Sequence, residues 1–237
     1  MMSIEVGCCG FPERKEKYFQ EFKLVEIQQT FYKLPFLETV KKWREEAPED
    51  FEFSLKAWQL ITHLPSSPTY GKGGLQIPAD KERNYGFFKP SEEVFAAWNK
   101  TRDIAQVLKV KVIVFQCPAS FVETAENIEN MTRFFTNVDR GNFIFVWEPR
   151  GKWNDDVIMA LCQDLDLIHC VDALERRPLH GETRYFRLHG GRNYRHQYTD
   201  DELTKLLQVA GDEAYILFNN ITMHSDALRF IELAKAR

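Results

Sequence analysis

Short apolar runs of strand length alternate with amphipathic stretches along most of the chain. Eight runs rich in Val, Ile, Phe and Tyr predict β-strands at Ile4–Cys8, Leu24–Thr30, Phe51–Ala57, Val110–Cys117, Phe143–Glu148, Leu167–Asp172, Tyr185–His189 and Ala214–Asn219. Stretches with helical spacing lie between them, at Leu37–Glu46, Glu92–Leu108, Ala125–Val138, Asp155–Leu165, Asp200–Val209 and Ser225–Lys235. Strands that alternate with helices predict a parallel α/β fold, and 237 residues suit a (β/α)8 TIM-type barrel.

A doubly wound open sheet is the alternative for such a pattern. Its dinucleotide-binding form carries Gly-x-Gly-x-x-Gly directly after the first strand, whereas this chain has Gly7-Cys8-Cys9-Gly10 there. No repeat and no linker divides the sequence. We therefore expect residues 1–237 to form a single barrel domain.

One connection is much longer than the others. Residues 64–89 follow the third strand and contain Pro65, Pro68, Gly71, Gly73, Gly74, Tyr85, Phe87 and Phe88. Connections of this length are uncommon and are usually functional or mobile. In a barrel this segment would rise from the C-terminal mouth as a lid, and the alternative is an insertion on the solvent side.

Polar residues inside the predicted strands keep to one side of each strand. In the seventh strand Tyr185, Arg187 and His189 alternate with Phe186 and Leu188. Other polar residues either share one side of their strand in the same way or stand at its end. They are Glu26, Gln28, Ser54, Lys56, Gln116, Glu148, Arg150, Asp172 and Asn219. Barrel strands alternate between the interior and the helix layer, so the apolar side must face the helices. We expect the polar side to point into the barrel, near the strand ends where barrel enzymes have their active sites.

The charges expected in the interior nearly balance. Three carboxylates, Glu26, Glu148 and Asp172, stand against the cations Lys56, Arg150 and Arg187. Burying several charges is costly unless they pair with one another or bind a ligand. A self-satisfied ion-pair network is one interpretation, but the spread of these groups over most strands at one end favours a ligand pocket.

Further cations are concentrated around the seventh strand. They are Arg176, Arg177, Arg184, Arg187, Arg192 and Arg195, with His180, His189 and His196 between or beside them. Gly190-Gly191 follows the strand directly, and barrels commonly hold phosphate at the loops after strands seven and eight. Guanidinium groups and exposed backbone N–H groups suit phosphate or carboxylate. We therefore expect a small anionic or phosphorylated ligand; the alternative is a set of scattered, solvated arginines.

Overall charge and composition exclude several other classes. With 31 Lys and Arg against 35 Asp and Glu, the net charge of −4 does not favour nucleic acid or anionic membranes. No apolar run is long enough for a membrane helix, and the N-terminus does not resemble a secretory signal, so we expect a cytoplasmic protein. The five cysteines include no Cys-x-x-Cys, which argues against a disulfide framework and a thiolate zinc site. The adjacent Cys8-Cys9 are expected to be buried reduced thiols, the alternative being a redox pair.

Several short motifs occur in a fixed order. They are Val25–Tyr32, Phe53–Ala57 with Thr62-His63, Phe115–Phe121, Glu148–Arg150 with Trp153, Tyr185–Gly190 and Phe218–Asn220. Through these motifs the chain resembles the YecE-like family, domain of unknown function 72, over nearly its whole length. The resemblance implies a (β/α)8 barrel and no established activity. Gly7–Phe11 departs from the family's Gly-Thr-Ser-Gly-Trp, and Gln28 stands where Asn is usual.

These observations favour an enzyme that acts on a phosphate-bearing or other anionic substrate by acid–base chemistry at the C-terminal mouth. The catalytic candidates are Glu26, Lys56, Glu148 and His189. The substrate-binding candidates are Gln28, His63, Gln116, Arg150, Arg187, Gly190, Asn219 and Asn220. No cofactor or metal is predicted with certainty; in a metal-assisted variant, hydrolytic or isomerising, the ligands would be Glu26, Glu148, Asp172 and His189.

Two other functions stay open. Lys56 could form a Schiff base with a carbonyl substrate, whereas its simpler role is an ion pair with Glu26 or Glu148. A non-catalytic barrel that binds a ligand, a protein or single-stranded nucleic acid would use the aromatic residues Trp58, Tyr85, Phe87 and Phe88 near the long connection. A deep pocket at the mouth favours the enzyme, and a flat aromatic groove on residues 64–89 favours the binding protein.

Overall fold

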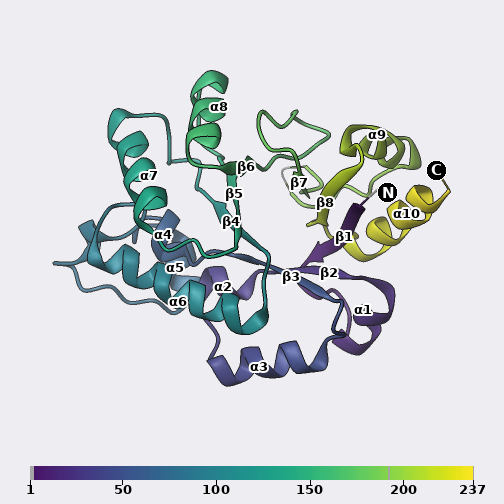
Figure 1. The fold of residues 1–237 in the computed structure, drawn as a ribbon, viewed down its shortest axis with the longest axis horizontal. Coiled ribbons are helices and arrows are strands. Elements are labelled where there is room, and N and C mark those ends of the chain that lie inside the picture. The colour runs from purple at the N-terminus through teal and green to yellow at the C-terminus, as the bar shows by residue number, and fades with distance from the viewer. Residues whose placement is uncertain (1–2, 192, 237) are drawn as a thin grey trace.

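Eight parallel strands form a near-closed barrel in the computed structural model, which describes residues 3–191 and 193–236 (Figure 1). The strands are β1 (Ser3–Cys9), β2 (Leu24–Ile27), β3 (Glu52–Lys56), β4 (Val112–Gln116), β5 (Ile144–Glu148), β6 (Leu167–His169), β7 (Arg184–Leu188) and β8 (Glu213–Phe218). Their order is β6-β5-β4-β3-β2-β1-β8-β7. The predicted (β/α)8 architecture is confirmed, because the first and last strands of the chain pair with each other.

Helices cover the outside of these strands. They are α1 (Lys15–Glu21), α2 (Gln29–Tyr32), α3 (Leu37–Glu46), α4 (Gln59–Thr62), α5 (Pro68–Lys72), α6 (Glu92–Leu108), α7 (Ala125–Asn137), α8 (Asp155–Asp164), α9 (Asp200–Ala210) and α10 (Met223–Lys235), with a 3-10 turn η1 (Glu82–Asn84). The six longer helices have the predicted bounds within two residues. Side-chain caps explain this accuracy: Ser91 and Thr199 each accept a hydrogen bond from a backbone N–H in the first turn of α6 and α9.

Two predicted strands extend three residues beyond the observed C-terminal ends. The second was expected to reach Thr30, but β2 ends at Ile27 because residues 29–32 turn into the short helix α2. The sixth was expected to reach Asp172, but β6 ends at His169. Beyond it the chain leaves β5 and meets β7 only at the bridge between Val171 and Phe186.

The alternation of side chains in the barrel is the predicted one. One buried cluster fills the interior with Cys9, Leu24, Val112, Val114, Val146, Ile168, Cys170, Tyr185, Tyr215 and Leu217. The intervening residues, such as Val25, Ile113 and Phe186, belong to the larger cluster shared with the helices. The polar residues of the same parity then lie above the apolar interior layer, at the C-terminal ends of the strands.

The barrel has a seam between β6 and β7. The described residues of β6 itself form no ladder with β7. The bridge lies just after β6, between Val171 and Phe186, and is supported by a hydrogen bond from the Arg187 N–H to the Val171 carbonyl (3.1 Å). No helix lies between β6 and β7 among the described residues, and Figure 1 shows an irregular loop in its place. Within the described part of the chain, no helix is both long and apolar enough to cross a membrane.

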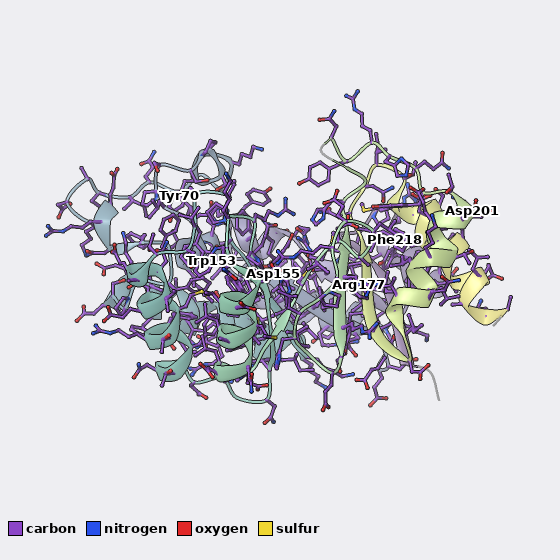
Figure 2. All side chains as sticks on the ribbon, turned by 90° about the horizontal axis from the view of Figure 1, so that it is seen from above. Tyr70, Trp153, Asp155, Arg177, Asp201 and Phe218 are labelled. Carbon is purple, nitrogen blue, oxygen red and sulfur yellow. The ribbon has the colours of Figure 1, made fainter. Side chains whose placement is uncertain are left out.

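The long connection is folded against the barrel. Phe88 is fully buried against Phe115, Phe121 and Phe134, and Phe87 packs on Phe121. Phe87 and Phe88 therefore pack inward and do not add to the flat aromatic groove by which the alternative function would be recognised. Figure 2 shows Tyr70 of this segment on the opposite side of the molecule from Phe218, at the end of β8. The segment contributes to one side of the mouth, whereas motion as a lid stays a prediction.

Candidate functional site

Arg187 on β7 links the two buried carboxylates of the mouth. Its Nε lies 3.1 Å from both oxygens of Glu26, and its Nη1 donates to Glu148 and to the Gln116 amide oxygen (3.2 Å). Nη2 lies 2.9 Å from Glu26 Oε1 and 3.5 Å from the Gln28 amide oxygen. Only 1% of the Arg187 side chain is exposed. Every guanidinium nitrogen is thus occupied within the protein, which makes Arg187 a structural centre of the mouth.

Glu26 lies at the floor of this network. It is fully buried and also accepts hydrogen bonds from the Tyr185 hydroxyl (2.8 Å) and from Gln28. The register of the sheet places Glu26 beside Cys9 on β1 and Ser54 on β3, so neighbouring strands enclose it. Glu26 therefore positions Arg187 and does not face the space where a ligand would lie.

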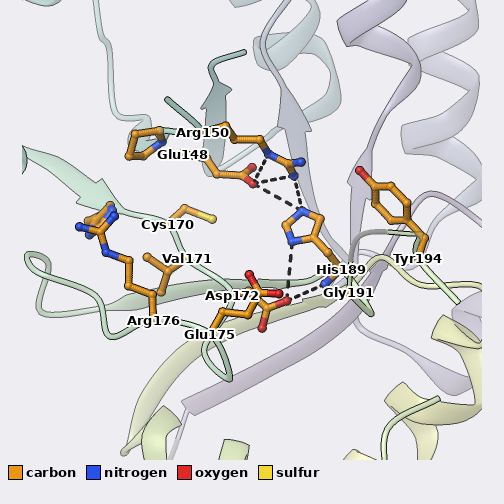
Figure 3. A pocket seen from close by; sticks show the side chains of 12 residues that line it. Glu148, Arg150, Cys170, Val171, Asp172, Glu175, Arg176, His189, Gly191 and Tyr194 are labelled. Carbon is orange, nitrogen blue, oxygen red and sulfur yellow. Dashed lines mark hydrogen bonds and ion pairs between the residues drawn. The ribbon is translucent and has the colours of Figure 1, made fainter. Parts of the chain in front are cut away.

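Glu148 begins a second chain of contacts. It accepts hydrogen bonds from Nη2 (2.8 Å) and Nε (3.0 Å) of Arg150, and Arg150 in turn donates to His189 Nε2. His189 Nδ1 lies 3.8 Å from Asp172, which also accepts a hydrogen bond from the His189 N–H (2.9 Å; Figure 3). Although burial opposes it, the neighbouring Arg187 and Arg150 lower the pKa of Glu148 to about 2. Glu148 is therefore ionised at neutral pH and is a poor proton acceptor.

A cavity of about 430 Å³, the central pocket, opens above this network. It is lined by Gln28, Phe31, Tyr32, Lys56, His63, Thr69, Lys72, Gln116, Arg187, Tyr194 and Asn219. Three of these residues are cations, and no Asp or Glu stands among the described residues of the lining. The central pocket combines positive charge with amide groups, which is the chemistry that binds an anion.

Lys56, the last residue of β3, is the buried cation of the central pocket that has no acidic partner among the described residues. Its side chain is 6% exposed, and its Nζ lies 3.7 Å above the centre of the Phe31 ring. It makes no hydrogen bond or ion pair with any residue that the structure describes. Burial and then the charge of Arg187 lower the pKa of Lys56 to about 7, against the partial compensation of Glu148 and Glu26. Glu26 and Glu148 form their ion pairs with Arg187 and Arg150, and neither forms one with Lys56, so the simpler interpretation of this lysine is wrong.

His63 forms another wall of the central pocket. Its Nδ1 lies 2.8 Å from the Thr62 hydroxyl, and its ring meets the Phe31 ring edge to face. Burial lowers the pKa of His63 to about 3, with a further contribution from Lys56. His63 is neutral at pH 7 and offers a hydrogen bond without adding charge.

A second cavity of about 330 Å³, the seam pocket, lies where β5, β6 and β7 end. Its lining includes Glu148, Arg150, His169, Asp172, Glu175, Arg176, His189 and Tyr194 (Figure 3). Tyr194 borders both cavities. In contrast to the central pocket, acidic and basic residues are mixed here, and Arg176 pairs with Asp155 at the start of α8. His169 and Tyr194 are lining residues that the strand pattern does not single out, although both lie within or beside the histidine- and arginine-rich stretch.

Two predicted ligand-binding residues are occupied by structural contacts. The Gly190 N–H donates to the Tyr198 hydroxyl (2.7 Å), and a Cβ at Gly190 would lie 2.6 Å from the Asn220 Cβ. Asn220 is buried and donates to the His196 carbonyl (2.8 Å) and to Asp226 (2.6 Å). These residues fix the loop after β7 against α10, and neither lines the central or the seam pocket.

The arginines around β7 do not gather at one site. Arg184 lies at the N-terminal end of the strand and donates to the Val209 carbonyl, whereas Arg187 is buried at the opposite end. Arg176 is on the surface beside Asp155, Arg177 and Arg195 are exposed, and Arg192 lies outside the described residues. These arginines are close in the sequence, but most of them do not contribute positive charge to the mouth.

The residues considered for a metal are not arranged around one. Glu26 and Glu148 both bind Arg187, and the described residues contain no cluster of three His, Cys, Asp or Glu side chains that could hold an ion. Cys8 and Cys9 lie on successive residues of β1 and belong to different clusters, on opposite sides of the strand. Burial raises the pKa of Cys8 to about 12 and raises that of Cys9, so both thiols are protonated.

The fold and the site define a near-closed (β/α)8 barrel with a polar, cation-lined mouth. Residues 11–236 match the family described as protein of unknown function DUF72, and the chain belongs to this family. Among curated relatives, UPF0759 protein YunF of Bacillus subtilis is 29% identical over 117 residues, which cover 49% of this chain and 36% of YunF. UPF0759 protein YecE of Escherichia coli is 33% identical over 82 residues, covering 27% of this chain and 30% of YecE. The matched part thus spans about a third of these relatives.

Solved structures agree with the fold. A DUF72 family protein from Enterococcus faecalis has a TM-score of 0.73 at 17% identity and covers 99% of this chain and 98% of that one. More distant barrels include a D-psicose 3-epimerase (TM-score 0.60, 10% identity, 100% and 99% covered) and an AP endonuclease, family 2, from Brucella melitensis (0.58, 10%, 93% and 93%). At these identities the likeness is one of fold.

Proposed function

We propose that this chain is an enzyme that binds a small phosphate- or carboxylate-bearing substrate in the central pocket and acts on it by acid–base chemistry. The charge of the pocket wall carries the proposal: Lys56, Lys72 and Arg187 line it without a carboxylate among the described lining residues. Since Arg187 is already neutralised by Glu26 and Glu148, the uncompensated positive charge is that of the two lysines. An anion would offset the cost of burying Lys56.

Proton transfer in the central pocket is best assigned to Lys56, because His189, the other candidate, is not among the described residues that line this pocket. A catalytic acid or base works best when its pKa is near the working pH, and that of Lys56 is about 7. His189 stands in the wall of the seam pocket and is oriented by Arg150 and Asp172. Glu26 and Glu148, which the sequence also suggested as catalytic, hold the arginines in place.

Thermal unfolding in inorganic phosphate or sulfate, against sodium chloride at equal ionic strength, tests the proposal. A ligand at 100 times its dissociation constant stabilises by about 2.7 kcal/mol, which for a chain of this size raises Tm by roughly 5–10 °C. We expect Lys56→Met to abolish the shift and Lys72→Met to reduce it. Arg176→Met, in the seam pocket, is the matched control and should keep it. An equal shift in chloride, or an undiminished shift in Lys56→Met, would refute the proposal.

A further inference from the structure

Lys56 has the surroundings of a nucleophile, and not only those of an anion ligand. We propose that its amine forms an imine with the carbonyl carbon of an anionic aldehyde or ketone held in the central pocket. The inference rests on the proposed function, because the same cations would bind the anionic group of that substrate. It adds a carbonyl group to the substrate and a covalent step to the reaction.

The position of Lys56 is fixed by its backbone. The Thr30 hydroxyl donates to the Lys56 carbonyl (2.7 Å), the register pairs Lys56 with Val114 on β4, and the following residue, Ala57, donates to the Val114 carbonyl (2.9 Å). The side chain then extends over the Phe31 ring into the wall of the central pocket. A nucleophile held on a rigid strand end meets its substrate at small entropic cost.

The carboxylates that would otherwise neutralise Lys56 are committed elsewhere. Glu26 and Glu148 both bind Arg187, and Glu148 also binds Arg150. Burial of the side chain, and then the charges of Arg187 and Arg150, favour the neutral amine. The more distant charges of Glu148 and Glu26, together with the Phe31 ring, favour the ammonium in part. A substantial fraction of Lys56 is thus unprotonated near neutral pH, as imine formation requires.

The chemistry of this step is balanced without a further reactant. The amine lone pair attacks the carbonyl carbon, and the carbonyl π-electrons move to oxygen to give a carbinolamine. That oxygen takes up protons and leaves as water while the nitrogen forms a double bond to carbon. Counted from the ammonium form, lysine and carbonyl compound give a protonated imine and one water. The protonated imine withdraws electrons from the neighbouring C–H or C–C bond, so the reaction class is isomerisation or carbon–carbon bond cleavage.

Other lysines of the chain serve as internal controls. Lys111 is 64% exposed and pairs with Glu52, and Lys23 pairs with Asp50 on the surface. Both lysines lie on the surface outside the central pocket, so their labelling measures the reactivity of an ordinary exposed lysine. Labelling confined to Lys56 would therefore indicate a reactive site in the central pocket. Labelling in proportion to the exposure of each lysine would indicate ordinary surface chemistry.

Reductive trapping tests the inference. The full chain is incubated at pH 7 with sodium cyanoborohydride and, separately, pyruvate, glyoxylate, dihydroxyacetone phosphate, ribose 5-phosphate or uncharged dihydroxyacetone. Hydride addition to the imine carbon leaves a secondary amine, so the protein gains the mass of the compound less one oxygen atom. We expect at least one anionic carbonyl compound to modify Lys56 at least tenfold faster than it modifies Lys111. The same compound should modify Lys56 at least tenfold faster than dihydroxyacetone does. Peptide mapping identifies the modified lysine. Inorganic phosphate should slow this reaction.

Two variants and the phosphate assay separate the outcomes. Lys56→Arg keeps a cation but has no comparable nucleophile, and should lose the adduct; Lys72→Arg should retain it. No adduct on Lys56 across the panel, together with a phosphate-dependent Tm shift, would overturn the imine and leave the proposed function standing. Adduct formation on Lys56 that is equally fast with dihydroxyacetone and insensitive to phosphate would support the imine and contradict anion binding. Labelling of Lys56 no faster than Lys111 would overturn the inference.

Discussion

The central pocket and the seam pocket share Tyr194 and the Glu148–Arg187–Glu26 network, yet their charges are arranged differently. In the central pocket the described lining holds Lys56, Lys72 and Arg187 and no carboxylate. In the seam pocket both arginines of the described lining have an acidic partner: Arg150 binds Glu148, and Arg176 binds Asp155. The two cavities at this mouth thus differ in charge: the central pocket offers a ligand uncompensated positive charge, whereas the arginines of the seam pocket are already paired.

This difference shows why a count of charged residues does not locate a ligand site. Summed over the mouth, acids and bases nearly balance, as the sequence indicated. Among the buried charges of the described residues, local pairing neutralises Arg187 and Arg150 and leaves Lys56 without an acidic partner. We therefore expect binding and chemistry at Lys56, which has no acidic partner, and not at the more numerous arginines.

The largest effect should come from breaking the network on which both pockets stand. Arg187→Met leaves Glu26 without its cation and weakens the pairing of Glu148, and removing one partner of a buried ion pair costs roughly 3–5 kcal/mol. Urea unfolding measures the loss of stability. Lys111→Met, which removes an exposed partner of Glu52, is the control and should cost less than about 1 kcal/mol. Equal effects of the two substitutions would contradict the assigned role of Arg187.

Acid should destabilise the fold through a buried histidine of each pocket, His63 and His169. Burial lowers the pKa of His169 to about 4, from the ordinary 6.5, and the Leu179 N–H donates to its Nδ1 (3.1 Å). The unfolded chain therefore binds a proton below pH 6.5 that the folded chain takes up only near pH 4. Stability falls as the pH drops between these values, by up to about 3 kcal/mol for this residue.

Urea unfolding between pH 7 and pH 4.5 checks this dependence. His169→Asn keeps an acceptor near the Leu179 N–H but cannot titrate, so its stability should depend less on pH than that of the wild type. His63, whose pKa is lowered to about 3, should account for the remaining slope in that range. A slope unchanged by His169→Asn would show that the seam pocket hydrates this ring.

Replacing Lys56 should stabilise the protein while abolishing phosphate binding. Lys56 has a pKa of about 7 in the folded chain against 10.5 for an ordinary lysine, so below pH 7 folding must bury an ammonium group. Lys56→Met removes that cost, and we expect a gain of about 2 kcal/mol at pH 6. Because wild-type stability rises with pH from about 7 to 10.5 through this residue, the gain should shrink over that range. A loss of stability at pH 6 would show that Lys56 has a partner.

The smallest effect is expected in the seam pocket. Arg176→Met removes a partly exposed arginine whose partner, Asp155, is also exposed, and such pairs contribute roughly 0–1 kcal/mol. Neither stability nor the phosphate-induced Tm shift should change measurably. If phosphate binding is lost in Arg176→Met and kept in Lys56→Met, the seam pocket is the anion site and the comparison is reversed.

Much of the fold could be predicted because its signals are local. Strand length, the alternation of Tyr185 to His189 and the N-caps at Ser91 and Thr199 each involve a few neighbouring residues. The end of β2 was predicted too late because residues 29–32 form the short helix α2. The packing of Phe87 and Phe88 against Phe121, 33 or more residues away in the chain, could not be predicted from their own segment.

The sequence by itself determined that Glu26, Lys56, Glu148 and Arg187 share the interior parity at the carboxyl ends of their strands, because side chains alternate with period two. Only the tertiary structure decided which of them pair. Glu26 and Arg187 are 161 residues apart and meet because β1, β2, β7 and β8 are neighbours across the closed side of the barrel. The strand register and the closure of the barrel place both Glu26 and Glu148 against Arg187, so that Lys56 has no ion pair with either carboxylate. Ion pairs depend on the distance between side chains in space, and the sequence does not specify the distances between strands.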